Sequence, residues 1–168
     1  ITIVSRVANQ APVLQPIGNK TATETQLFQL QLLATDADGD QLTFSGTNLP
    51  PGSTLDPVTG MFRWTPNFNQ SGAYDNISFT VSDGNRSVTE AINITVVNTN
   101  RAPVAIPMIP QSGREDAILS FTIAAADLDN DSLVLTSLTA LPAGAHFDSR
   151  TGEFEWKPDF NQAGTYSF

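Results

Sequence analysis

The stretch ISFTVSDGNRSVTEAINITVV, Ile77 to Val97, contains two runs in which apolar and polar residues alternate. Every second residue is apolar from Ile77 to Val81, and the pattern returns from Ile92 to Val96. A period of two with one apolar face is typical of a β-strand that is buried on one side. Gly, Pro, Asn and Asp interrupt such runs about every 8 to 12 residues, which predicts an all-β sandwich fold.

The chain also contains an internal repeat. Thr59 to Tyr74, TGMFRWTPNFNQSGAY, matches Thr151 to Tyr166, TGEFEWKPDFNQAGTY, at an offset of 92 residues. Asn9-Gln10-Ala11-Pro12 matches Asn100-Arg101-Ala102-Pro103 at an offset of 91 residues. A copy of this length has the usual size of a seven-stranded β-sandwich, so we predict two such domains in tandem.

The repeat also predicts the domain limits, because the first six residues align with the last strand of the first copy. Proline at the end of the linker favours extended geometry in the residue before it, which favours an end-to-end arrangement. The predicted segments are 1–8, the last strand of a preceding copy; 9–97, the first sandwich; 98–103, the linker; and 104–168, a second sandwich that lacks its last two strands.

Composition excludes several classes of function. The 168 residues carry a formal net charge of -9, which argues against partners that need clustered Lys and Arg, such as nucleic acids and anionic membranes. The chain has no cysteine and therefore neither disulfides nor thiolate metal sites. No apolar run reaches the 18 or more residues of a membrane span. An extracellular protein without disulfides needs another means of stiffening, and metal ions are one option.

Two acidic runs stand at matching places in the repeat. They are DADGD, Asp36 to Asp40, and DLDND, Asp127 to Asp131, 91 residues apart. Alternating carboxylates suit a hard cation such as calcium, but Asp and Gly also suit an ordinary turn before a strand. An EF-hand is excluded at the first run, because Gln41 and Thr47 stand where that loop needs glycine and glutamate.

The order of the motifs resembles the cadherin-like superfamily. The chain has Asn-x-Ala-Pro, an acid at Glu24, Asp-x-Asp before a strand, Asp56-Pro57-x-Thr59-Gly60, and Val81-Ser82-Asp83-Gly84. This set is most similar to the dystroglycan-type cadherin-like, or "putative Ig", tandem repeats of large bacterial surface and secreted proteins. The resemblance implies tandem Ig-like/cadherin-like Greek-key β-sandwiches, the second one incomplete.

The resemblance also implies calcium at the junctions between repeats. The ligands expected at the junction of the two copies are Glu24, Asn98, Asn100, Asp127 and Asp129. Those expected at the N-terminal junction are Asn9, Asp36, Asp38 and Asp83. The linker has fewer acids than a cadherin linker, and Phe68-Asn69-Gln70-Ser71 replaces a Leu-Asp-Arg-Glu motif. We therefore expect weak calcium binding, with a dissociation constant of about 10⁻⁴–10⁻³ M or above.

These features predict a non-enzymatic structural or adhesion module of an extracellular or cell-surface bacterial protein. The single histidine, His146, has no counterpart in the first copy, and no nucleophile elbow is present. Expected partners are neighbouring repeats, a second copy through homophilic contact, and a glycan or cell-surface ligand. A carbohydrate-binding module could use Trp64 and Trp156, although repeated bulky residues more often pack in a core. A third alternative is strand exchange, in which Ile1 to Val7 complete the second repeat of another molecule.

Overall fold

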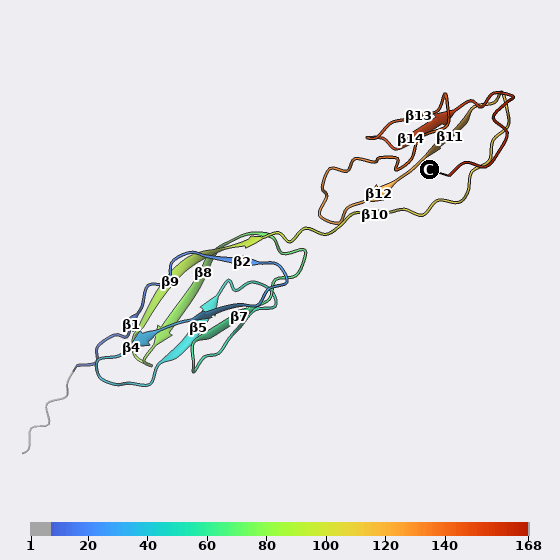
Figure 1. Ribbon diagram of the computed structural model, residues 1–168. Helices are drawn as coiled ribbons and strands as arrows, with labels where there is room; N and C mark the ends of the chain where they lie inside the picture. Colours follow the sequence, from blue (N-terminus) through green and yellow to red (C-terminus); the bar gives the residue numbers. More distant parts are fainter. Residues whose placement is uncertain (1–7, 168) are drawn as a thin grey trace, which may run out of the picture. The chain divides into compact units, whose positions relative to one another are not determined.

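A computed structural model describes residues 8–167 of the chain, and all of its regular elements are β-strands (Figure 1). The chain divides into two compact units: unit 1 ends at Thr99 and unit 2 begins at Asn100. Among the described residues, no helix is long and apolar enough to cross a membrane. The strand predicted over 1–8 lies outside the described residues except for Ala8, and the predicted domain limits remain predictions.

Unit 1 is a sandwich of two main sheets. The larger sheet has the strand order β2-β9-β8-β5, the smaller has the order β3-β7-β6, and β1 pairs separately with β4. The strands of unit 1 are β1 Val13–Leu14, β2 Lys20–Thr23, β3 Phe28–Gln31, β4 Ala34–Thr35, β5 Thr43–Thr47, β6 Thr54–Leu55, β7 Met61–Trp64, β8 Gly72–Ser82 and β9 Ser87–Val97. The prediction of an all-β sandwich is confirmed for this unit.

The hairpin of β8 and β9 is the centre of the larger sheet. Each strand has 11 residues, and the stretch that alternates in the sequence alternates in burial as well. Its apolar residues Ile77, Phe79, Val81, Ile92, Ile94 and Val96 are buried. Burial of one such side chain contributes roughly 1.5–3 kcal/mol relative to leaving it exposed, so this hairpin supplies much of the core.

Aromatic side chains join the two sheets of unit 1. The ring of Phe62 on β7 meets the ring of Phe79 on β8 edge to face, with centroids 5.4 Å apart. On the same strand as Phe62, Trp64 contacts Tyr74 with centroids 4.8 Å apart and donates its indole N–H to the carbonyl oxygen of Pro51. Edge-to-face aromatic pairs contribute beyond the area they bury, so these contacts fix how the sheets pack.

Unit 2 repeats the smaller sheet of unit 1. Its strands are β10 Val104–Ala105, β11 Leu119–Thr122, β12 Ala125–Ala126, β13 His146–Phe147 and β14 Glu153–Trp156. The sheet β11-β14-β13 corresponds to β3-β7-β6, and Leu119 pairs with Trp156 as Phe28 pairs with Trp64. The prediction of an all-β tandem repeat is thereby confirmed for the described residues.

Unit 2 has no counterpart of the larger sheet among its described residues. In unit 1, β5 is hydrogen-bonded to β8 along its whole length. Residues 134–138 align with β5 in the repeat but form no strand in unit 2. The physical reason is that a strand needs a partner for its N–H and C=O groups, and the described part of unit 2 holds no strand corresponding to β8.

Candidate cation-binding loops

The first acidic run folds into a compact loop, Asp36–Asp40, which we call loop 1. The Oδ1 atom of Asp36 accepts hydrogen bonds from the backbone N–H groups of Asp38 at 2.9 Å and of Asp40 at 3.2 Å. Gly39 takes a φ of 79°, which glycine adopts without strain. One carboxylate oxygen from each of the three aspartates lies within 4.8 Å of the others. The sequence predicted Asp36 and Asp38 as ligands, and the structure adds Asp40.

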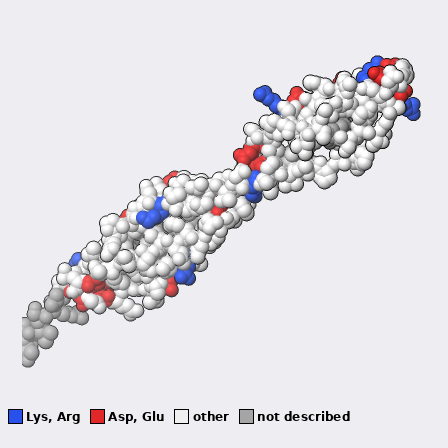
Figure 2. All heavy atoms as spheres, viewed as in Figure 1, with Lys and Arg blue, Asp and Glu red and all other residues white. Residues whose placement is uncertain are grey.

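Loop 1 contains an unsatisfied acceptor. The Oδ2 atom of Asp36 is buried and has no hydrogen-bond partner. A buried carboxylate oxygen without a donor is unfavourable, because it has lost its hydrogen bonds to water and has no hydrogen bond within the protein to replace them. Charged groups are sparse on the surface that Figure 2 shows, where carboxylate-bearing side chains gather in a few small groups. Three carboxylates in one short loop therefore concentrate negative charge in a chain that is otherwise weakly charged.

The segment Asn9-Gln10 connects loop 1 with the β8–β9 turn. The backbone N–H of Gln10 donates to Oδ2 of Asp38 at 2.6 Å, and the side-chain amide of Asn9 donates to Oδ2 of Asp83 at 2.9 Å. The N–H of Arg86 and, after it, the Asn9 amide hold the pKa of the Asp83 carboxyl below its ordinary value. Of the four predicted N-terminal ligands, Asn9 is thus bonded to Asp83 and its neighbour Gln10 to Asp38, whereas Asp36 bonds to Asp38 and Asp83 is not part of the three-acid group.

The second acidic run, Asp127–Asp131 or loop 2, has the same backbone fold. Oδ1 of Asp127 accepts the N–H groups of Asp129 at 2.8 Å and Asp131 at 3.2 Å. The surroundings of Asp129 differ, because its Oδ1 accepts Nε of Arg101 at 3.0 Å and Nη2 at 2.7 Å. Hydrogen bonds from the Arg101 side chain hold the pKa of the Asp129 carboxyl below its ordinary value. The positively charged guanidinium of Arg101 thus lies against loop 2.

Glu24, a predicted ligand, is fully buried in unit 1 with 0% of its surface exposed. Its Oε1 accepts the backbone N–H of Ser71 at 2.8 Å, and its Oε2 accepts the backbone N–H of Thr99 at 2.9 Å. The hydroxyl of Thr99 also donates to the Glu24 carbonyl oxygen. The carboxylate therefore links the segment that follows β9, at Thr99, to the segment that precedes β8, at Ser71.

The remaining predicted ligands are Asn98 and Asn100, and both side chains are exposed. Glu24 and Asn98 belong to unit 1, whereas Asn100, Asp127 and Asp129 belong to unit 2. A site shared by these five residues therefore remains a proposal.

The donor atoms of loop 1 match the chemistry of a hard divalent cation. Calcium takes six to eight oxygen ligands, and carboxylates, amide carbonyls and water all serve. The cluster offers only oxygen, which does not favour the softer metals that select nitrogen or sulfur. Asp38 and Asp40 are exposed, so water can complete a coordination shell and binding would be weak.

The two tryptophans are core residues. Trp64 and Trp156 are 1% and 6% exposed. Each contacts a tyrosine edge to face and donates its indole N–H to a backbone carbonyl oxygen. This confirms the packing interpretation and leaves no exposed indole face for stacking on a sugar.

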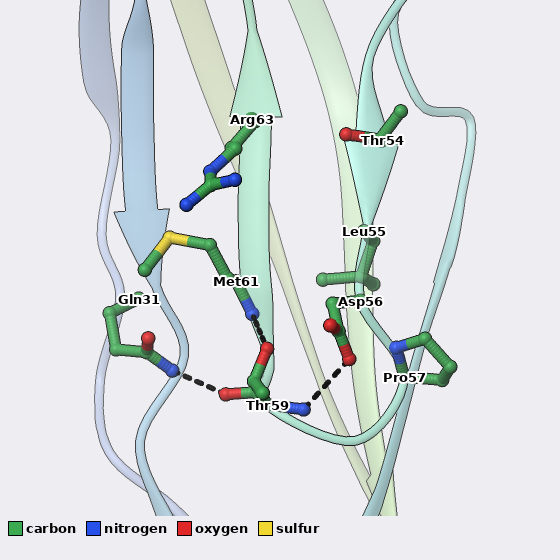
Figure 3. A pocket seen from close by; sticks show the side chains of 8 residues that line it. All are labelled: Gln31, Thr54, Leu55, Asp56, Pro57, Thr59, Met61 and Arg63. Carbon is green, nitrogen blue, oxygen red and sulfur yellow. Dashed lines mark hydrogen bonds between the residues drawn. The ribbon is translucent and has the colours of Figure 1, made fainter.

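An open hollow of about 700 Å³ lies beside β6 and β7 (Figure 3). Its described lining includes no aromatic residue. Several of its polar groups are bonded to one another: Oδ1 of Asp56 accepts the N–H of Thr59, and the amide of Gln31 donates to the Thr59 carbonyl oxygen. Without an aromatic residue in its described lining, the hollow offers no stacking platform for a carbohydrate.

Comparison with known proteins identifies the family. Residues 9–95 match the family described as "Bacterial Ig domain". The chain belongs to this family. Residues 102–168 of the same bacterial Ig protein match a second family described as "Putative Ig domain". The tandem Ig/cadherin-like repeat that the sequence predicted is thus confirmed.

A curated relative places this kind of repeat within a larger protein. The bacterial Ig chain is 31% identical over 131 residues to chitinase A of Pseudoalteromonas piscicida. The match covers 76% of the chain but only 16% of the chitinase, so the chain spans about a sixth of that relative.

Solved structures show the same fold at low identity. Human protocadherin-24 EC1-2 (form II) has a TM-score of 0.63 and 18% identity, over 92% of this chain and 83% of the other. A protocadherin gammaB7 EC3-6 structure has a TM-score of 0.57 and 16% identity, over 94% of this chain and 46% of the other. At such identities the likeness is one of fold alone.

Proposed function

We propose that the chain is a non-catalytic spacer of an extracellular bacterial protein, in which calcium bound at loop 1 restricts the hinge between neighbouring repeats. The family match and the similarity to part of a chitinase support the placement in an extracellular multi-domain protein. The role as a spacer is supported by the tandem repeats and by the two tryptophans, which are packed in the core and form no exposed aromatic platform.

One observation carries the calcium proposal. Three carboxylates gather in loop 1, and the buried Oδ2 of Asp36 has no hydrogen-bond partner. A divalent cation would neutralise the cluster and supply the missing partner of that oxygen. Since Asn9 and Gln10 bond to Asp83 and Asp38, a cation in loop 1 would also order the segment that leads into the repeat.

The test is a calcium titration of the whole chain by calorimetry and by thermal unfolding. Wild-type protein should bind calcium with a dissociation constant of about 10⁻⁴–10⁻³ M, and the melting temperature of unit 1 should rise. Asp36→Asn should greatly weaken both effects, because it removes one of the three negative charges of the cluster and replaces one carboxylate oxygen by an NH2 group. Asp127→Asn tests the predicted site of Glu24, Asn98, Asn100, Asp127 and Asp129 in the same titration.

Stiffening is tested separately, in a chain in which residues 9–99 occur twice in tandem. X-ray scattering should give a narrower distribution of inter-repeat distances in millimolar calcium than in chelator. The Asp36→Asn change in the second of the two copies should remove the difference. Identical scattering with calcium and with chelator would refute the hinge proposal, even if calcium binds.

A second candidate function is self-association by strand uptake, which one groove favours. Unit 2 has a groove of about 960 Å³, lined in part by Leu119, Phe121, Ile123, Phe154 and Trp156. In unit 1, the residues that correspond to Phe154 and Trp156 pack against β8. The occupant we propose is residues 1–7 of a second copy, because 1–6 align with 92–97 of β9, the strand beside β8 whose Ile92, Ile94 and Val96 are buried in the core of unit 1.

Light scattering tests this second candidate. Wild-type protein should form dimers or longer chains, and deletion of residues 1–8 should give a monomer. Phe121→Glu should have the same effect, because it puts a charge in the groove that the strand would fill. A wild-type monomer at high concentration would dispose of strand uptake.

A further inference from the structure

Loops 1 and 2 share their backbone hydrogen bonds, but the residue that donates its N–H to the second aspartate is Gln10 at loop 1 and Arg101 at loop 2. In loop 1, Oδ2 of Asp38 accepts the backbone N–H of Gln10 at 2.6 Å. In loop 2, Oδ2 of Asp129 accepts the backbone N–H of Arg101 at the same distance, 2.6 Å. Gln10 and Arg101 occupy the same position of the repeat, so the two loops differ in the side chain at this point and not in the path of the chain.

The Arg101 side chain is built into loop 2. Its guanidinium bonds to Oδ1 of Asp129 through Nε and Nη2, and Nη2 also donates to the Leu128 carbonyl oxygen at 2.6 Å. The side chain of Asp129 is 3% exposed and that of Arg101 is 20% exposed. A guanidinium that donates several bonds to a largely buried carboxylate is held in a defined geometry, unlike a surface ion pair.

The positive charge of Arg101 makes the acids of loop 2 differ from those of loop 1. Within the described residues, a three-acid group suited to a metal forms at loop 1, and its members are Asp36, Asp38 and Asp40. The orphaned carboxylate oxygen also lies in loop 1. In loop 2, the positive charge of Arg101 already neutralises Asp129, and the guanidinium is bonded to the carboxylate oxygen Oδ1 that a metal ion would need as a ligand.

We propose that Arg101 is an internal substitute for the metal ion in loop 2, and that Gln10 leaves loop 1 to an external divalent cation. The residue after the asparagine of Asn-x-Ala-Pro thereby decides whether a repeat depends on metal. The part that concerns loop 1 rests on the proposed function, whereas the part that concerns Arg101 does not. One protein would then contain a metal-dependent repeat next to a metal-independent one.

Exchange of the two residues provides the test. The whole chain is prepared as wild type, Arg101→Gln, Gln10→Arg and the double exchange. Unit 1 is followed by the fluorescence of Trp64 and unit 2 by that of Trp156, with the other tryptophan replaced by phenylalanine in each case. Thermal unfolding is measured in chelator, in millimolar calcium and in millimolar magnesium, and calcium binding is measured by calorimetry.

In wild-type protein, calcium should stabilise unit 1 and leave unit 2 unchanged. Arg101→Gln should lower the melting temperature of unit 2 in chelator, and calcium should restore it. Adding Asp127→Asn to Arg101→Gln should remove this new calcium response. Gln10→Arg should raise the melting temperature of unit 1 in chelator and reduce its calcium affinity at least tenfold. Arg101→Lys, which keeps the charge but loses the planar fork, should fall between wild type and Arg101→Gln.

The outcomes separate the two proposals. If no variant binds calcium, the proposed function fails, and the role of Arg101 is decided by the chelator data alone. Unchanged melting of unit 2 in Arg101→Gln under chelator would overturn that role. A wild-type calcium response lost in Asp127→Asn but kept in Asp36→Asn would overturn the assignment of the metal to loop 1.

Discussion

Glu24 offers a sharp test of how the first repeat is closed. The change is Glu24→Gln in the whole chain, measured in chelator so that no metal contributes. Each carboxylate oxygen accepts one backbone N–H, from Ser71 and Thr99. Glutamine keeps one oxygen, so one of these N–H groups faces an amide NH2 in a fully buried site. A buried N–H without an acceptor costs about 1–3 kcal/mol.

The expected loss can be measured as a shift in melting temperature. A central value of about 2 kcal/mol corresponds to a decrease of roughly 8–16 °C for a domain of this size. Glu24→Ala leaves both N–H groups without a partner and should cost about 2–6 kcal/mol in total. The assay is urea and thermal unfolding in a Trp156→Phe background, in which Trp64 reports on unit 1 alone.

The chain provides a matched control at Glu115, which aligns with Glu24 but is exposed in unit 2. Glu115→Gln should change the free energy of unfolding by less than about 0.5 kcal/mol, because it removes no buried acceptor. The reasoning is refuted if Glu24→Gln unfolds within about 0.5 kcal/mol of wild type, or if the control is destabilised equally.

Three further predictions follow from the packing and the charges. Hydrogen bonds from Arg101 lower the pKa of Asp129 below the ordinary aspartate value of 3.8. The ion pair therefore stabilises unit 2 fully above pH 3.8, and this contribution is lost as the pH falls through the lowered pKa. Below pH 3.8, the stability of unit 2, followed by Trp156 fluorescence, should therefore decrease more steeply with falling pH in wild type than in Arg101→Gln. Gly60→Ala should destabilise unit 1 by about 1–2 kcal/mol or more, since φ is 68° and the added Cβ would lie 3.0 Å from the Leu32 carbonyl oxygen. Urea unfolding should show a smaller loss for Gly39→Ala, which meets no atom within 4 Å. Phe79→Ala should cost about 3–5 kcal/mol in the same assay, because the buried ring leaves a cavity between the sheets.

Most of the fold could be predicted because its signal is local. The alternation in Ile77–Val97 is a property of neighbouring residues, and it reappears as alternating burial in β8 and β9. The repeated segments that contain Trp64 and Trp156 predicted two similar domains and a packing role for both indole rings. The structure has two compact units, and both rings are buried in it. The loss of a strand at residues 134–138 was less accessible, because pairing depends on the partner strand and not on the sequence of the strand itself.

The candidate site was only partly accessible. The resemblance to the cadherin-like superfamily implied Asp36 and Asp38 as ligands, and the third acid, Asp40, stood in the same alternating run. In the structure, the orphaned oxygen and the three-acid group lie in the first acidic run, at Asp36.

The sequence by itself determined the strands, the repeat and the places where acids gather, because each is written in residues that are near one another or repeated in register. Tertiary structure alone decided what each acid contacts. Arg101 and Asp129 are 28 positions apart, and Glu24 and Thr99 are 75 positions apart. Such pairs form only when the sandwich brings distant segments together. Tertiary contacts thereby made the Glu24 carboxylate a buried link between two segments and the Asp129 carboxylate the partner of an arginine, and they left Oδ2 of Asp36 buried without a hydrogen-bond partner.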